Sequence, residues 1–182
     1  MSTTNLRVYM NDQLALGVLW RELARRAARE NAGTELGADL ARVAQAISED
    51  VATFESLMVR LGLRRNRLKP RAAAVLERLG RFKLNGSLTS YSELSRFAEL
   101  EFLVMGIEGK KQLWNTLANL AGLSTRAPDV DFDGLIARAE VQRSTLEPHR
   151  VAAGRKAFLG ASSGRAALSD EAGSGAGLLS LH

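Results

Sequence analysis

Two glutamates lie in the most apolar long segment of the chain, residues 90–122. Glu101 and Glu108 are one heptad apart, so on a helix both would border the same face. Carboxylates in that position can ligate a metal ion or serve as general bases. They can also form buried ion pairs with arginines of a neighbouring helix, such as Arg143 or Arg150. We favour the ion pairs, because an unpaired charge beside a buried face is costly.

Other groups that could carry chemistry are few. The chain has no cysteine, which excludes disulfides, thiolate catalysis and zinc–thiolate sites. Its two histidines are His149 and His182. His149 could be a ligand or a proton carrier, but a lone histidine on an apolar face is more often a packed, hydrogen-bonded core residue. The sequence contains neither a strained-turn nucleophile motif nor a glycine-rich phosphate loop.

A basic cluster follows the second apolar segment and could dock phosphate groups. It consists of Arg64, Arg65, Arg67, Lys69 and Arg71. The cluster lacks the interleaved aromatic residues that stack on bases, so a solvated loop is the simpler interpretation. A net charge of +5 and a pI near 10.1 are compatible with an anionic partner. Nucleic acid is therefore a possible partner but not the favoured one.

Four long helices must position these groups. The chain is rich in Ala, Leu, Arg and Glu and has no alternating β-branched run, so we predict an all-α fold. Its 182 residues are enough for one domain with a sizeable core. Apolar residues at helical spacing, with glycines beyond the ends, predict helices over residues 4–31, 35–61, 90–121 and 131–159. Trp20 and Trp114 fall on inner faces and are interpreted as core anchors.

Three details of these helices can be predicted as well. The inner face of the first helix should carry Leu6, Tyr9, Gln13, Leu16, Gly17, Trp20, Leu23, Ala24 and Ala27. Pro148, inside the last helix, should kink it or end it early. Residues 63–86 are too long for a tight loop and should form a crossover with a short helix over 70–79. Such a crossover makes the third long helix parallel to the second.

The C-terminal residues differ in composition from the rest. Gly, Ser and Ala dominate residues 160–182, which predicts a flexible tail after a bundle over 1–159. The last residues, Leu178, Leu179 and Leu181, are apolar again. The N-terminus has no apolar stretch resembling a signal peptide, and the longest apolar run, 102–107, is too short to span a bilayer. We expect a cytoplasmic protein without a membrane partner.

Five segments carry a resemblance to a known superfamily: VYMNDQLALGVLWRELARR, ISEDVATFESLMVRLG, GRFKLNG, SRFAELEFLVMGIEGKKQLW and ARAEVQRSTLEPHR. They resemble ferritin-like proteins, especially small uncharacterised ones of actinobacteria with a degenerate metal site. The resemblance implies a ferritin-like up-down four-helix bundle with a long crossover connection. It also implies a homodimer, since many bundles of this plan associate through helix faces.

Metal-binding members of this superfamily place a glutamate on each of two helices and a Glu-x-x-His on the other two. The positions that match here are Glu22, Glu49, Glu101 or Glu108, and Glu140. The residues three positions after Glu49 and Glu140 are Ala52 and Arg143, and no Glu-x-x-His is present. We therefore expect no cofactor and an interaction or scaffold protein. The alternative is an oxidoreductase or metal-storage protein that binds iron or manganese through these carboxylates.

The tail resembles the C-terminal peptide by which some ferritin-like proteins enter encapsulin nanocompartments. A small-residue spacer, 172–176, precedes the terminal GLLSLH of residues 177–182. The match lies in its glycine, its spaced aliphatic residues and its Ser-Leu pair, while the final histidine departs from the usual basic residue. The resemblance implies a protein partner bound through Leu178, Leu179 and Leu181. An unstructured end is the simpler interpretation.

Overall fold

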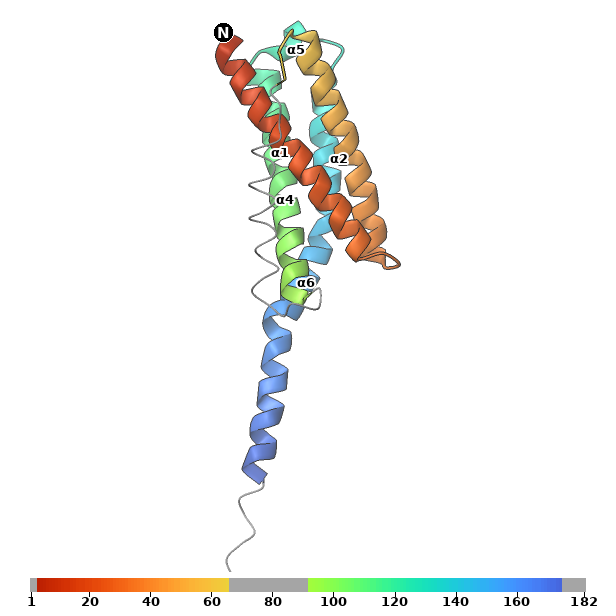
Figure 1. The fold of residues 1–182 in the computed structure, drawn as a ribbon, viewed down its shortest axis with the longest axis vertical. Coiled ribbons are helices and arrows are strands. Elements are labelled where there is room, and N and C mark those ends of the chain that lie inside the picture. The colour runs from red at the N-terminus through yellow and green to blue at the C-terminus, as the bar shows by residue number, and fades with distance from the viewer. Residues whose placement is uncertain (1–2, 66–91, 175–182) are drawn as a thin grey trace, which may run out of the picture.

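The chain is helical through most of the part that the structure, a computed structural model, describes: residues 3–65 and 92–174 (Figure 1). Its four long helices are α1 Thr3–Glu30, α2 Glu35–Arg60, α4 Glu93–Asn115 and α6 Phe132–Ser174. A π-helical turn, η2 Thr116–Leu120, continues α4, and the short helix α5 Leu123–Arg126 follows it. The described residues contain no strand, so the predicted all-α fold is confirmed.

The helix ends follow from the local geometry of the residues that flank each helix. Thr34 precedes α2, and its Oγ1 accepts a hydrogen bond from the Gly37 amide at 3.0 Å. Asp131 precedes α6, and its Oδ1 accepts from the Gly134 amide at 2.8 Å. Both side chains satisfy amides that have no partner within the first turn of a helix. Gly62 follows α2 with a φ of 66°, a conformation that glycine adopts without strain from a Cβ atom.

The long helices form two antiparallel pairs, α1 with α2 and α4 with α6. The pairs meet through the contacts of α1 with α4 and of α2 with α6. In Figure 1, α1 and α6 run in one direction while α2 and α4 run in the other. α2 and α4 are therefore parallel, as predicted from the long connection between them. Most of that connection, including the predicted helix over 70–79, lies outside the described residues.

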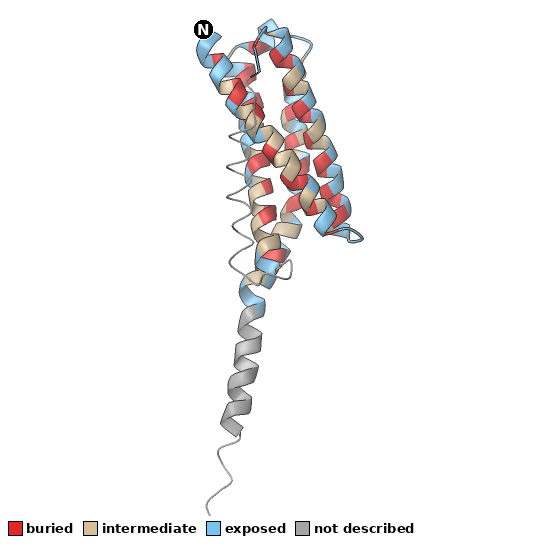
Figure 2. Ribbon diagram, viewed as in Figure 1, coloured by how far each residue is buried: buried red, intermediate tan, exposed pale blue. Residues whose placement is uncertain are grey.

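The core is made by the inward faces of the four helices (Figure 2). The prediction of the inner face was wrong for part of α1. Leu16 is 40% exposed, whereas Met10, Leu14 and Leu19, which the predicted face omitted, are fully buried. The reason is that α1 packs against both α2 and α4, so its buried surface is wider than a single apolar stripe. The centre of this surface lies one residue away from the centre of the predicted face.

Helix α6 differs from its prediction in two ways. It continues through Pro148, which is exposed, so water can satisfy the carbonyl that loses its hydrogen bond. Packing of Leu146 and Ala153 on either side holds the helix in place. It also runs past the predicted end at Leu159 to Ser174, a length of 43 residues, and its last turns project beyond the bundle (Figure 1). The predicted flexibility of 160–182 stays a prediction.

Candidate functional site

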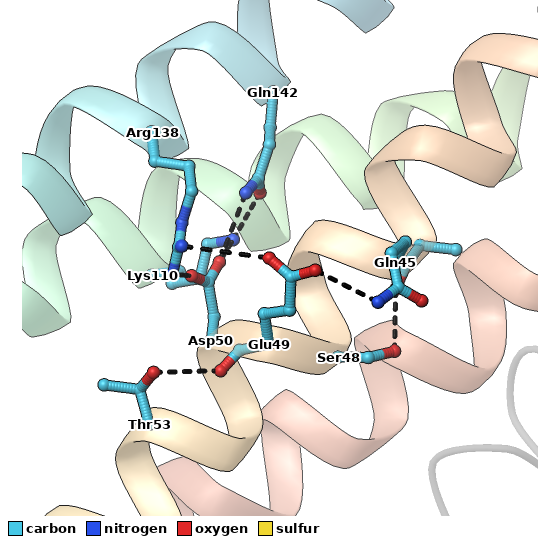
Figure 3. Close-up of polar contacts among 9 residues, drawn as sticks. Gln45, Ser48, Glu49, Asp50, Thr53, Lys110, Arg138 and Gln142 are labelled. Carbon is cyan, nitrogen blue, oxygen red and sulfur yellow. Dashed lines mark hydrogen bonds and ion pairs between the residues drawn. The ribbon is translucent and has the colours of Figure 1, made fainter.

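The carboxylate of Asp50, the most deeply buried charge among the described side chains, lies between α2, α4 and α6 and forms an interior ion-pair network with Lys110, Arg138 and Gln142 (Figure 3). Asp50 is 2% exposed and comes from α2. Lys110 reaches it from α4, while Arg138 and Gln142 reach it from successive turns of α6. One carboxylate thus ties together three of the four long helices.

Hydrogen bonds use both oxygens of this carboxylate. Lys110 Nζ donates to Asp50 Oδ2 and also to Gln142 Oε1, and Arg138 Nη2 donates to Asp50 Oδ1. Gln142 Nε2 donates to Asp50 Oδ2 at 3.2 Å. Burial lowers the pKa of Lys110, and the nearby Asp50 carboxylate opposes that change. With its oxygens occupied by three donors, Asp50 is placed to hold the helices together and not to abstract a proton.

The predicted metal ligands border the bundle but do not converge. Glu22 lies 3.0 Å from Arg21 Nε and 3.3 Å from Arg25 Nη1. Glu49 accepts a hydrogen bond from Gln45 at 3.0 Å (Figure 3). Its carboxylate is also 3.9 Å from Arg138 Nη1, at the exposed edge of the interior ion-pair network. Basic or amide groups thus occupy these oxygens.

The same holds for the glutamates on α4 and α6. Glu101 pairs with Arg150 at 3.5 Å, and Glu108 pairs with Lys111 at 2.8 Å. The predicted pairing is therefore present for Glu101, but both glutamates are more than 40% exposed, so the prediction of buried pairs was wrong. Both side chains take part in ion pairs between α4 and α6, because Arg150 and Glu140 lie on α6 and Lys111 pairs with both Glu108 and Glu140.

Glu140 is the most strongly stabilised anion of this set. It accepts hydrogen bonds from Arg143 at 2.6 Å and from Lys111 at 2.8 Å. These contacts, with Arg143 contributing most, lower its pKa to about 2. Among the side chains that the structure describes, those of residues 3–65 and 92–160, no three from Asp, Glu or His are grouped so that they could hold a metal ion. The donor set that a dinuclear site requires is therefore not assembled by these residues.

A second buried polar contact ties α2 to α6. His149 Nε2 lies 2.7 Å from Asp39 Oδ2, and Arg42 donates to the other oxygen of Asp39. The interpretation of His149 as a packed, hydrogen-bonded residue is confirmed. The sequence analysis named neither Asp39 nor Asp50 among the candidate residues. A signal existed, because the two aspartates lie three helical turns apart on the same flank of the apolar stripe of α2.

Only part of the basic cluster can be placed. Arg64 and Arg65 are exposed, and Arg65 pairs with Glu55 at 2.5 Å. The backbone oxygen of Arg64 accepts a hydrogen bond from Asn11 at 3.1 Å. The other three members, Arg67, Lys69 and Arg71, lie outside the described residues, as do the tail residues Leu178, Leu179 and Leu181.

Comparison of the chain with protein-family models, with curated proteins and with solved structures found no match. None of the helices in the described ranges combines the length and the apolar character needed to cross a membrane. What the chain does must therefore be inferred from its own residues.

Proposed function

We propose that this protein is a ferritin-like bundle that works without a metal, as an interaction or scaffold protein. The observation that carries this proposal is the position of Lys110. Its ammonium group lies in the bundle interior between the oxygens of Asp50 and Gln142. These three residues come from three different helices, α4, α2 and α6. In metal-binding bundles of this plan, oxygen ligands from facing helices converge on cations in the core. Here the cation that core oxygens of two facing helices contact is a side chain, that of Lys110.

The charge balance supports the metal-free state. Lys110 and Arg138 bring two positive charges to the single carboxylate of Asp50. A divalent ion placed there would be repelled by both cations in a region of low dielectric. The carboxylates at the bundle surface could bind metal only by giving up their existing ion pairs.

The projecting end of α6 supports an interaction role. At 1.5 Å per residue, a helix of 43 residues is about 65 Å long, while α4 with 23 residues is about 35 Å long. An isolated helical end without an apolar face to pack against is marginally stable in water. Phe158 and Leu159, exposed where α6 leaves the bundle, offer apolar surface to a partner or to a second copy of this chain.

Metal analysis of the purified protein tests the first part of the proposal. After expression with added iron and manganese, we expect far less than one ion per chain. A tightly bound content of about two ions per chain, as in a dinuclear site, would refute it.

The interaction role is tested by replacing Phe158 and Leu159 with Asp in the full chain. Val141→Asp on the same helix is the control matched in exposure. Because the Phe158 ring also packs edge-on against Phe97 at 5.0 Å, circular dichroism must show that the double variant is folded. We expect the double variant, and not the control, to lose self-association or partner binding in light-scattering measurements. If neither variant changes an existing assembly, or if the parent forms none, an interaction role for this region is wrong.

The cargo role is a specific form of this proposal, because α6 directs the chain away from the bundle as it approaches the tail (Figure 1). Co-expression with an encapsulin shell tests it. Full-length protein should co-purify with shells, and a chain ending at residue 176 should not. Equal recovery of both, or of neither, would exclude this role.

A further inference from the structure

A cavity of about 260 Å³ lies where α1 meets α2 and α4. Each of these helices contributes one aromatic wall: Trp20, Phe54 and Trp114. The opening is bordered by Leu16 of α1 and Met105 of α4, which are 40% and 61% exposed. An apolar space of this kind holds water poorly, so filling it with an apolar group is favourable.

Glycine on α4 shapes this space. A Cβ atom on Gly106 would lie 2.5 Å from Trp20 Cδ2, so the indole ring lies directly against the α4 backbone. On α1, a Cβ atom on Gly17 would lie 3.3 Å from the nearest atom of Val51. The absence of a side chain at Gly106 lets α1 approach α4 closely, and the absence of one at Gly17 lets α1 approach α2 closely, beside the cavity that the aromatic rings line.

One end of the cavity is polar, because Asp50 and Lys110 also line it. An ammonium group carries three N–H donors. Lys110 uses two of them, toward Asp50 and Gln142, and the third has no acceptor among residues 3–65 and 92–160, whose side chains the structure describes. The interior ion-pair network contains two cations, Lys110 and Arg138, and one carboxylate, Asp50, so it has one positive charge in excess. The exposed carboxylate of Glu49 balances this charge only from the far side of Arg138, where its Oε2 lies 3.9 Å from Arg138 Nη1. An anionic oxygen at this end would accept the third N–H and balance the charge.

We propose that this cavity binds a small aromatic monocarboxylate, with its ring packed against Trp20 and against the Phe54–Trp114 pair, whose ring centroids are 5.7 Å apart, and with its carboxylate on Lys110. The volume sets the size, because an apolar cavity of about 150 Å³ holds one benzene molecule, so about 260 Å³ suits roughly ten non-hydrogen atoms. Aromatic walls favour a ring through offset or edge-to-face contacts. This binding site is independent of the proposed interaction role of α6.

Phenylacetate is a probe of the required size and charge, and phenylacetamide is its neutral counterpart of the same shape. The readout is specific, because the chain has two tryptophans and both line the cavity. In full-length ¹⁵N-labelled protein, phenylacetate should shift both indole N–H signals in a saturable way. Phenylacetamide should bind about tenfold more weakly, since it lacks the charge-assisted hydrogen bond to Lys110.

Two glycines give a matched pair of variants. A Cβ atom on either Gly109 or Gly160 meets no atom within 4 Å, so both accept a side chain, but only Gly109 lines the cavity. Gly109→Leu should weaken phenylacetate binding at least about tenfold, while Gly160→Leu should leave it unchanged. Lys110→Met should remove the preference for phenylacetate over phenylacetamide. The proposal is wrong if the indole signals do not respond, if both probes bind equally to the parent, or if both glycine variants behave alike.

Discussion

Replacing Asp50 with Asn tests the interior ion-pair network directly. Asn keeps the shape of the side chain but removes the charge that holds Lys110 and Arg138. The Arg138 side chain is 38% exposed and can turn toward water. The Lys110 side chain is only 13% exposed, so its ammonium group would stay inside the bundle without an anion.

The cost of this substitution has an upper bound, because the amine of Lys110 can lose its proton instead of remaining charged. Deprotonating a group of ordinary lysine pKa at pH 7 costs about 4.6 kcal/mol. Removing one partner of a buried ion pair typically costs about 3–5 kcal/mol. We therefore expect Asp50→Asn to lower the free energy of unfolding by about 3–4 kcal/mol at pH 7.

Urea unfolding followed by circular dichroism measures this loss, with the exposed neighbour Glu49→Gln as the control. The control should change the free energy by less than about 1 kcal/mol. The loss in Asp50→Asn should shrink as the pH rises toward 10. Burial lowers the pKa of Lys110, so the folded chain binds fewer protons than the unfolded chain and gains stability with rising pH. A loss below about 1 kcal/mol at pH 7, or no recovery at high pH, would refute the reasoning.

Three further predictions concern single residues. The hydrogen bond from Arg143 helps to hold the pKa of Glu140 at about 2 instead of 4.5, so the stability of the protein should fall as the pH drops from about 4.5 to 2. The fall should be smaller in Glu140→Gln, and thermal unfolding of both proteins across this pH range measures the difference. Gly106→Ala should cost about 1–3 kcal/mol in denaturant unfolding, because its Cβ atom would overlap the Trp20 ring. Pro148→Ala should raise the melting temperature, with a gain of up to about 3 kcal/mol, because it restores a backbone donor within α6.

The sequence predicted the helices well and the interior charges poorly. The ends of α2, for example, were predicted at residues 35 and 61 and lie at Glu35 and Arg60, because Thr34 and Gly62 act through local geometry. The end of α6 was missed, because the Gly, Ser and Ala residues beyond Leu159 carry no periodic apolar pattern to mark a helix.

The buried charges could not be predicted in the same way. Whether Asp50 or Glu101 faces the interior depends on how α4 and α6 pack against α2, and both residues border an apolar stripe in the sequence. The residues predicted as metal ligands were all glutamates, because the resemblance to ferritin-like proteins implies glutamate ligands. The shorter aspartates, Asp39 and Asp50, are the carboxylates that the core encloses on α2. The cavity was also unpredictable, since it exists only where three helices meet.

The long sequence separations within the interior ion-pair network have a consequence for folding kinetics. Asp50 and Lys110 are 60 positions apart, and Asp50 and Arg138 are 88 apart, whereas the α1–α2 hairpin is local. Contacts between distant segments form only after the connecting chain has closed, so the network should be absent from the folding transition state. Its stabilisation then acts on the unfolding rate: Asp50→Asn should unfold faster while refolding at nearly the parent rate. The buried lysine would thus determine how long the folded bundle lasts, and not how quickly it forms.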